Sequence, residues 1–409
     1  MNKIKGLLRH INEGFHDLCY IWCEEMKLTW KDEGVLIFFI IVPLLYPLLY
    51  SWIYTNEVVR EVPVAVVDMS HSHLSRNFIR LFDASPDTKV AYHCNNLEEA
   101  RDLVGHQQVY GVIYFPADFQ TNINRLEQSN VSVFCDMSFM LYYKNIFQTA
   151  TAVAGKLNEN IQIERAGNKT DREDEITTKP LDYADVPMFN TTGGYGNFII
   201  PGVLVVILQQ TLLLGIGLSS GTGREKNRFK YLVPVSRHNN GTFRIVLGKS
   251  ICYLMIYSVV ASYLTLIVPR MFDFVSMLHP WDLFRFMLPY TLACIFFSMT
   301  LTGAIRHRED IMLMVVFTSI PFLFMSGVSW PQSAIPMFWQ YAADLVPSTF
   351  GVRGFVRMNT MGARLEDVMP EYHALWIQTG VYFLITCIVY RWEIIKTRRR
   401  IIKKLRNKE

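Results

Sequence analysis

The chain alternates between long apolar runs and polar segments, and the apolar runs have the length of membrane-crossing helices. A helix needs about 20 mostly apolar residues to cross the roughly 30 Å hydrocarbon core of a bilayer. Six stretches of nearly this length lack charged side chains, at 35–54, 198–218, 251–269, 286–305, 311–329 and 374–390. The pattern therefore predicts an α-helical integral membrane protein with six transmembrane helices.

The first apolar run is interpreted as a retained helix rather than a cleaved signal peptide. A polar stretch of 34 residues precedes it, and no small-residue cleavage site follows. We therefore place a cytoplasmic segment at 1–34 before the first span.

The region 55–197, between the first two spans, has the pattern of a soluble domain. Short β-branched runs occur at 62–68, 89–93, 110–116 and 131–136, and segments with helical spacing separate them. This alternation predicts a small α/β domain. Its end contains a charged stretch with few apolar residues, near 166–180, which we expect to be a flexible loop.

Charge placement predicts the orientation of the spans, although the net charge is only +4. The tail 391–409 carries nine Lys or Arg, and residues 219–246 carry six against the single acid Glu225. The positive-inside rule puts both on the cytoplasmic side. With six spans, both termini are then cytoplasmic, 55–197 and 330–373 are external, and the basic turn at 306–310 is internal. We interpret the basic runs as setting topology and touching anionic lipid, not as binding nucleic acid.

No catalytic or metal-binding constellation stands out. The Gly-Lys-Ser at 248–250 is not a nucleotide-binding P-loop, because Phe243 occupies the position of the required glycine and an apolar run follows. Asp68, His71 and His73 are too few for a metal site, so a structural or solvated role is expected. Cys94 and Cys135 both fall in the external domain, and the sequence leaves open whether they form a disulfide.

Two polar features lie within the apolar pattern. Gln209 and Gln210 occupy the middle of the second span, where an amide facing lipid would be costly. They are assigned either to a translocation pathway or to hydrogen bonds between helices. Gly327, Pro331 and Pro336 break the partly apolar stretch 326–350, and such backbone at membrane depth must be buried in protein. We expect a re-entrant segment there.

Several motifs resemble those of ABC-transporter permeases of the type-2 (ABC-2) membrane family, bacterial exporter subgroup with a large external domain. They are VPVAVVDMSHSHLSR from 62, YGVIYFPADF from 110, GREK from 223, LGK from 247 and MSGVSWPQSAIPMFWQYAADLVPSTFGVRGF from 325. The resemblance spans nearly the whole chain. It differs from the family pattern after Glu225, where Asn227, Arg228 and Phe229 replace a second glutamate and a Gly-Thr.

The resemblance implies roles for several segments. It makes 5–33 an amphipathic connecting helix at the inner membrane surface, and 219–250 the cytoplasmic loop that contacts an ATPase. It implies that Arg224, Glu225, Lys226 and Pro234 take part in that coupling. No residue of this chain is then catalytic and no cofactor is bound by it, because ATP is hydrolysed on a separate partner subunit.

The function implied by the resemblance is export. The chain is expected to be an inner-membrane permease that moves hydrophobic or amphiphilic, drug-like compounds outward by alternating access. It implies a homodimer or a heterodimer with a sibling permease, and contact with a periplasmic adaptor protein and an outer-membrane channel. Two alternatives stay open from the residues, an ion-coupled secondary transporter and a membrane-anchored receptor. The substrate is not readable from the sequence.

Overall fold

A computed structural model describes residues 2–406, apart from 168–169, 183–185, 192, 227–231, 237–240, 304 and 306. The side chains of residues 2–12, 233–234 and 400–406 also lie outside the description. The chain divides into two compact units, one formed by residues 58–187 and the other by the remaining residues on both sides. The two units are described separately below.

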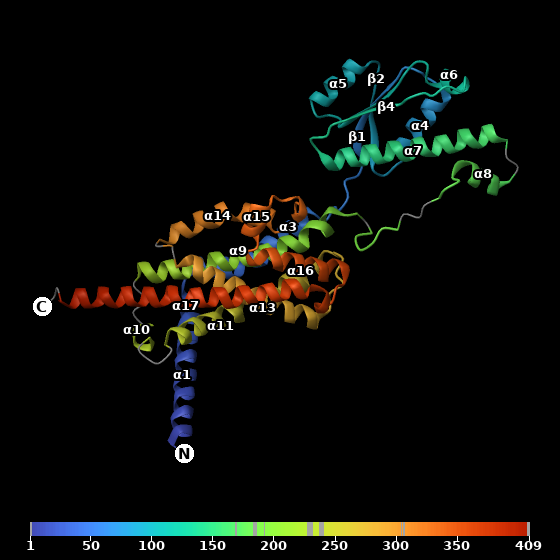
Figure 1. Ribbon diagram of the computed structural model, residues 1–409. Helices are drawn as coiled ribbons and strands as arrows, with labels where there is room; N and C mark the ends of the chain where they lie inside the picture. Colours follow the sequence, from blue (N-terminus) through green and yellow to red (C-terminus); the bar gives the residue numbers. More distant parts are fainter. Residues whose placement is uncertain are drawn as a thin grey trace. The chain divides into compact units, whose positions relative to one another are not determined.

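The larger unit is a helix bundle. Its long helices are α1 (Asn2–Lys31), α3 (Val42–Ile53), α9 (Tyr195–Glu225), α11 (Gly241–Ser262), α13 (Pro280–Thr302), α14 (Arg308–Met325), α16 (Pro347–Met361) and α17 (Met369–Arg406). Shorter helical pieces connect them, namely α2 (Glu33–Leu36), α10 (Leu232–Val235), α12 (Val268–Met271) and α15 (Met337–Ala343), together with the π-helical turns at 37–41 and 263–267. In Figure 1, α1 crosses the direction of the other long helices instead of running alongside them.

Among the residues that the structure describes, five helices are long and apolar enough to cross a membrane. They are Glu33–Ile53, Tyr195–Glu225, Gly241–Met271, Pro280–Thr302 and Leu365–Arg399. The protein is thus a mostly helical, multi-pass membrane protein. The segment expected as the fifth of six spans, 311–329, forms α14, which is not among the five. Its 18 residues include Arg308, Glu309 and Asp310 in the first turn, so the apolar part of the helix is short.

Helix α9 is buried over most of its length, and glycines bring its neighbours close. A methyl group added at Gly217 would lie 2.4 Å from Cδ1 of Ile311, and one at Gly221 would lie 3.0 Å from Cα of Arg308. These glycines are four residues apart and share one face, the spacing that lets two membrane helices approach closely. Near the other end of α9, Gly202 meets Val328 in the same way. Helix α14 and the turn after it therefore follow α9 along most of its length.

The helical spans extend beyond the predicted apolar runs. The segment 219–250 was expected to be a loop, but its two ends are helical, because α9 continues to Glu225 and α11 begins at Gly241. The sequence pattern misled here because basic residues follow the apolar run that ends at 218, whereas the helix itself continues through Arg224. Gly221 permits the close contact with Arg308.

The smaller unit is an α/β domain with a four-stranded sheet of order β2-β1-β3-β4. The strands are β1 (Val62–Asp68), β2 (Thr88–Cys94), β3 (Gly111–Phe115) and β4 (Ser132–Cys135), and only β4 is antiparallel to its neighbour. Helices α4 (His73–Asp83) and α7 (Met140–Ala166) share a buried cluster with one face of the sheet. On the other face, α5 (Leu97–Gly105) covers a smaller cluster. The short helix α6 (Phe119–Asn124) follows β3, and its Phe119 belongs to the cluster beneath α4 and α7.

The stretch near 166–180, expected to be a flexible loop, contains the short helix α8 (Asp171–Thr178). Thr170 caps this helix by accepting a hydrogen bond from the Glu173 N–H, and three acidic residues stand in its first turn. Acidic side chains are favourable at the positive end of a helix. The charge that suggested disorder therefore also suits a helix start.

Cys94 and Cys135 are both free thiols. They lie in β2 and β4, which form opposite edges of the sheet. Three strand spacings of about 4.8 Å separate those edges, whereas a disulfide needs Cα atoms within about 7 Å. Burial raises the pKa of the Cys135 thiol to about 11 and that of Cys94 above its usual value. Because the two cysteines lie on opposite edges of the sheet, they do not form the disulfide that the sequence left open.

Candidate functional site

A groove in the helix bundle lies between α3, α9 and α14. Its cavity has a volume of about 310 Å³ and is lined mainly by Val, Ile and Leu side chains. Its polar groups are few: Tyr46 and Tyr50 of α3, Gln210 and Thr211 of α9, and Ser319 of α14. Tyr46 donates a hydrogen bond of 3.2 Å to the Tyr50 hydroxyl. An apolar cleft with a few convergent polar groups has the usual make-up of a small-molecule site.

Gln210 is the polar centre of this groove. Only 9% of the residue is exposed, and neither its amide nitrogen nor its oxygen has a hydrogen-bond partner among the described residues. A buried amide left unpaired costs of the order of 1–3 kcal/mol. Both amide atoms are themselves covered, so a change of the Gln210 side-chain rotamer would turn this donor and acceptor toward a molecule in the groove.

The neighbouring Gln209 points elsewhere and is fully buried. Its side-chain oxygen accepts a 2.7 Å hydrogen bond from the backbone N–H of Ser348, in the first turn of α16, and lies 3.6 Å from Sγ of Cys294. The first N–H groups of a helix have no partner within the helix, so a buried helix start needs such an acceptor. Gln209 thus joins two helices, which is one of the two roles the sequence left open.

We expect Gln209→Leu to destabilise the protein by about 1–3 kcal/mol, because the Ser348 N–H would stay buried without an acceptor. Thermal unfolding in detergent measures this. Gln210→Leu is the matched control, since it removes an amide that has no partner and should leave stability equal or higher. Equal losses in the two variants would contradict the assignment.

The segment around Gly327, Pro331 and Pro336 connects α14 to this helix start. Gly327 has φ +87°, a conformation that glycine adopts without strain, and it lies two residues after the end of α14. Pro331 precedes a single helical turn at 332–334, and Pro336 precedes α15. Helix α16 then runs from Gln209 toward the start of α13, where its Asn359 carbonyl accepts from the Met277 N–H. The chain thus leaves α14 beside Gly202, reaches Gln209 at the start of α16, and returns along α16 toward the start of α13.

A cluster of ion pairs lies at the end of the bundle where α1 joins it. Lys249 of α11 donates a 2.7 Å hydrogen bond to Glu25 of α1, and both side chains are buried. Tyr253 also donates to Glu25, and the Ser219 hydroxyl lies 3.4 Å from it. Lys249 was expected at the boundary between the loop and the third span. It instead lies inside α11, where Glu25 neutralises its charge.

Two further ion pairs tie α1 and its end to the bundle. Arg244 of α11 contacts Asp17 at 2.7 Å, and Arg308 of α14 contacts Asp32 at 3.0 Å. Helix α1 is thereby attached to α11 at Asp17 and Glu25, and Asp32 just after it is attached to α14.

The residues expected to couple to an ATPase lie at this same end of the bundle. Arg224 is turned inward, where it donates to the Thr302 carbonyl at 2.6 Å and lies 3.8 Å from Glu393. Glu225 accepts from the Arg308 N–H at 3.0 Å, and Lys226 is exposed. Pro234 belongs to α10, and its side chain lies outside the described residues. Of the four, Arg224 and Glu225 hold the ends of α9, α13 and α14 together.

The α/β domain shows no metal site in its described residues, nor does the rest of the described chain. Asp68 accepts hydrogen bonds from the Ser70 and His71 N–H groups, each at 3.0 Å, and from the Ser75 hydroxyl at 2.7 Å. His73 begins α4, and its N–H donates to Gln120. Asp68 thus shapes the turn after β1, which is a structural role.

Sequence reasoning missed Glu25, Asp17 and Ser348. The two acids sit in an amphipathic helix among other charged residues, so nothing in the pattern distinguishes a buried acid from an exposed one. Ser348 acts through its backbone N–H, which leaves no signal in residue type. Pro347 marks the start of a helix, but the sequence does not show which group accepts hydrogen bonds from the first N–H groups of that helix.

The comparison with protein families agrees with this architecture. A family model described as ABC-2 family transporter protein matches residues 34–388, which run from the first candidate span into the last and include the α/β domain. No curated protein matches the chain. Since the match covers most of its length, the chain belongs to the ABC-2 family of transporter proteins.

Proposed function

We propose that this protein is the permease subunit of an ATP-driven exporter that moves hydrophobic or amphiphilic, drug-like compounds. The observation that carries the proposal is the groove between α3, α9 and α14, where Gln210 offers an unpaired amide among apolar side chains. An apolar compound with one or two hydrogen-bonding groups would satisfy this surface. Export by alternating access would expose the groove first to one side of the membrane and then to the other.

The energy source of the proposed exporter is a partner. Membrane components of the ABC-2 family work with a cytoplasmic ATPase subunit. ATP would therefore be bound and hydrolysed by that subunit, with no catalytic residue or cofactor on this chain. The end of the bundle that holds α1, the exposed Lys226 and α10 is the proposed contact surface. The ion pairs of α1 with α11 and α14 would pass movement of that surface to the spans.

A sixth span is part of the proposal. Helix α14 and Val328 in the turn after it follow α9 from Gly221 to Gly202, a distance of about 28 Å at 1.5 Å per residue. This length supports α14 as a crossing helix despite its charged first turn. Six crossings would place both termini on one side of the inner membrane, and the basic end of α17 favours the cytoplasm.

The proposed assembly contains two permeases. Exposed apolar side chains cover α3 and α14 beside the groove, among them Leu49 and Trp52 on α3 and Val316 and Phe317 on α14. A second copy or a sibling permease packed there would enclose the groove, and lipid would cover the remaining apolar surface. The external domain would then be available to a periplasmic adaptor and an outer-membrane channel.

Transport of a fluorescent amphiphile into inside-out vesicles tests the function. We expect accumulation to require ATP and the partner ATPase, and Gln210→Leu to slow it by about tenfold, the value of one lost hydrogen bond. The amount of folded protein should stay unchanged. Val259→Leu, on an exposed face of α11 away from the groove, is the control and should transport normally.

Two results would overturn the proposal. Transport that persists without ATP under an ion gradient would favour an ion-coupled transporter. Binding of the external domain to a partner without any transport would favour a membrane-anchored receptor.

A further inference from the structure

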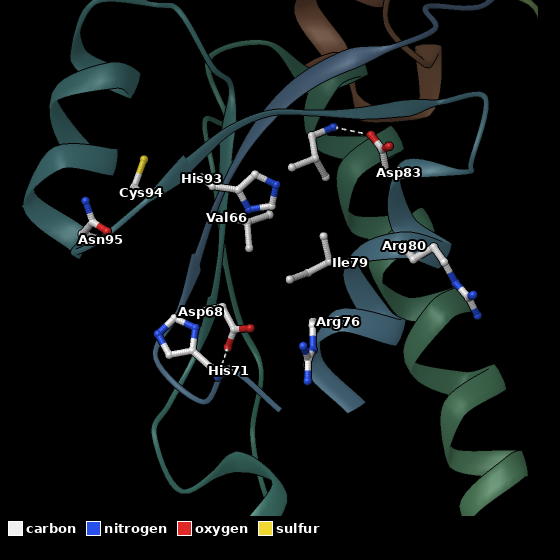
Figure 2. A pocket seen from close by; sticks show the side chains of 11 residues that line it. Val66, Asp68, His71, Arg76, Ile79, Arg80, Asp83, His93, Cys94 and Asn95 are labelled. Atoms are coloured by element: carbon white, nitrogen blue, oxygen red, sulfur yellow. Dashed lines mark hydrogen bonds between the residues drawn. The ribbon is translucent and has the colours of Figure 1, made fainter. Parts of the chain in front are cut away.

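A second cleft lies in the external domain, between α4 and the edge strand β2. Its volume is about 380 Å³. Figure 2 shows Arg76, Ile79 and Arg80 of α4 on one side, with residues of β1, β2 and the turn after β1 on the other. The cleft is part of the external domain alone, and no role described above uses it.

The cleft exists because of an irregularity in the pairing of β1 with β2. The register shifts between Val64 and Ala65, after which Val66 pairs with His93. Paired residues share a face of the sheet, and Val66 belongs to the cluster beneath α4. His93 therefore faces the α4 side of the sheet at its uncovered edge, where a hydrophobic residue would otherwise continue the core.

The positive groups of the cleft have no acidic partner. Arg76 and Arg80 are four residues apart and share a face of α4. Arg76 donates to the Ser72 carbonyl at 3.1 Å and Arg80 to the Asn77 side chain at 2.9 Å. Among the described residues, neither forms a salt bridge, and most donors of both guanidinium groups remain available.

The two acids of the cleft are already engaged. Asp68 accepts three hydrogen bonds within the turn after β1, and Asp83 accepts from the Val90 N–H at 2.8 Å. These bonds orient the carboxylates toward backbone. Since Arg76, Arg80, His71 and His93 supply the free donors, the cleft suits an anionic group better than a cation.

The surface between these donors is apolar. Val66, Ile79 and Val90 line the cleft, and Val66 is almost fully buried. We propose that this cleft binds a small amphiphilic anion, whose phosphate or carboxylate contacts Arg76 and Arg80 and whose apolar body covers Ile79 and Val90. The proposal does not depend on transport, because binding needs only the folded external domain of the full chain.

Calorimetry with the full-length protein in phosphatidylcholine nanodiscs tests the proposal, with hexyl phosphate as the probe. We expect hexyl phosphate to bind at least tenfold more tightly than inorganic phosphate or hexanol, and hexylammonium not to bind. The double variant Arg76→Gln/Arg80→Gln should weaken binding at least tenfold. Arg101→Gln, an exposed arginine on α5 across the sheet, is the matched control and should change affinity less than twofold.

Several outcomes would overturn the proposal: no binding by the wild type, equal binding of hexylammonium, or equal losses in the double variant and in Arg101→Gln. Nanodiscs that contain phosphatidylglycerol separate two sources of the anion. Suppressed binding of hexyl phosphate there would identify a lipid headgroup as the natural ligand, and unchanged binding would identify a soluble molecule. Either result keeps the anion site and is independent of ATP.

Discussion

Replacement of Glu25 by alanine is expected to destabilise the protein by about 3–5 kcal/mol, the usual cost of leaving one charge of a buried pair without its partner. The Lys249 ammonium would stay inside α11 with its 2.7 Å partner removed, and Tyr253 would lose its acceptor. Thermal unfolding of the purified protein in detergent measures the loss. The yield of monodisperse protein should fall in parallel.

Two further variants make this prediction specific. Glu24→Ala breaks the neighbouring pair with Lys27, which is exposed to solvent, and should cost less than about 1 kcal/mol. The double variant Glu25→Gln/Lys249→Met removes both buried charges, and should recover most of the stability lost in Glu25→Ala. If the double variant is as unstable as the single one, the ion pair is not the source of the effect.

The second large effect is expected at Gly215 of α9. A methyl group there would lie 1.8 Å from Cε1 of Phe39, far inside the contact distance of two carbon atoms. Phe39 cannot move aside easily, because it is fully buried and packs edge-on against Tyr253 and Tyr257 at centroid distances of 5.8 and 5.3 Å. We therefore expect Gly215→Val to cost about 3 kcal/mol or more.

The same thermal unfolding assay includes its own control. Gly380 lies in α17, and a methyl group added there meets no atom within 4 Å. Gly380→Ala should therefore stay within about 1 kcal/mol of the wild type. Adding Phe39→Ala to Gly215→Val should cost less than the sum of the two single variants, because the smaller side chain makes room for valine. Strict additivity would show that Phe39 is not what opposes the valine.

The α/β domain was the part of the fold most readable from sequence. The predicted strands at 62–68, 89–93, 110–116 and 131–136 match β1 to β4 closely. Each run is bounded by turn residues and flanked by segments with helical spacing, so local signals and tertiary structure agree. The sequence could not reveal the register shift beside Val64, because bulges depend on contacts between strands.

The bundle was less readable at its helix ends and in its polar contacts. Five of the six apolar runs coincide with candidate spans. Helices α9 and α11 extend past their runs because Arg224 and Lys249 find partners within the protein. Gln209 and Gln210 are adjacent and chemically identical, yet one caps α16 and the other lines the groove. The direction in which each side chain points from α9 matters only through the helices packed there, and these are distant in sequence.

The glycine contacts of α9 also determine how the bundle can move. Because Gly202, Gly217 and Gly221 hold Val328, Ile311 and Arg308 close along the whole helix, α9 and α14 cannot slide or rotate past each other without steric clashes. The pair should behave as one rigid body in any conformational cycle. A change in the width of the groove must then come from α3, which contributes Val42, Tyr46 and Tyr50 to the groove wall.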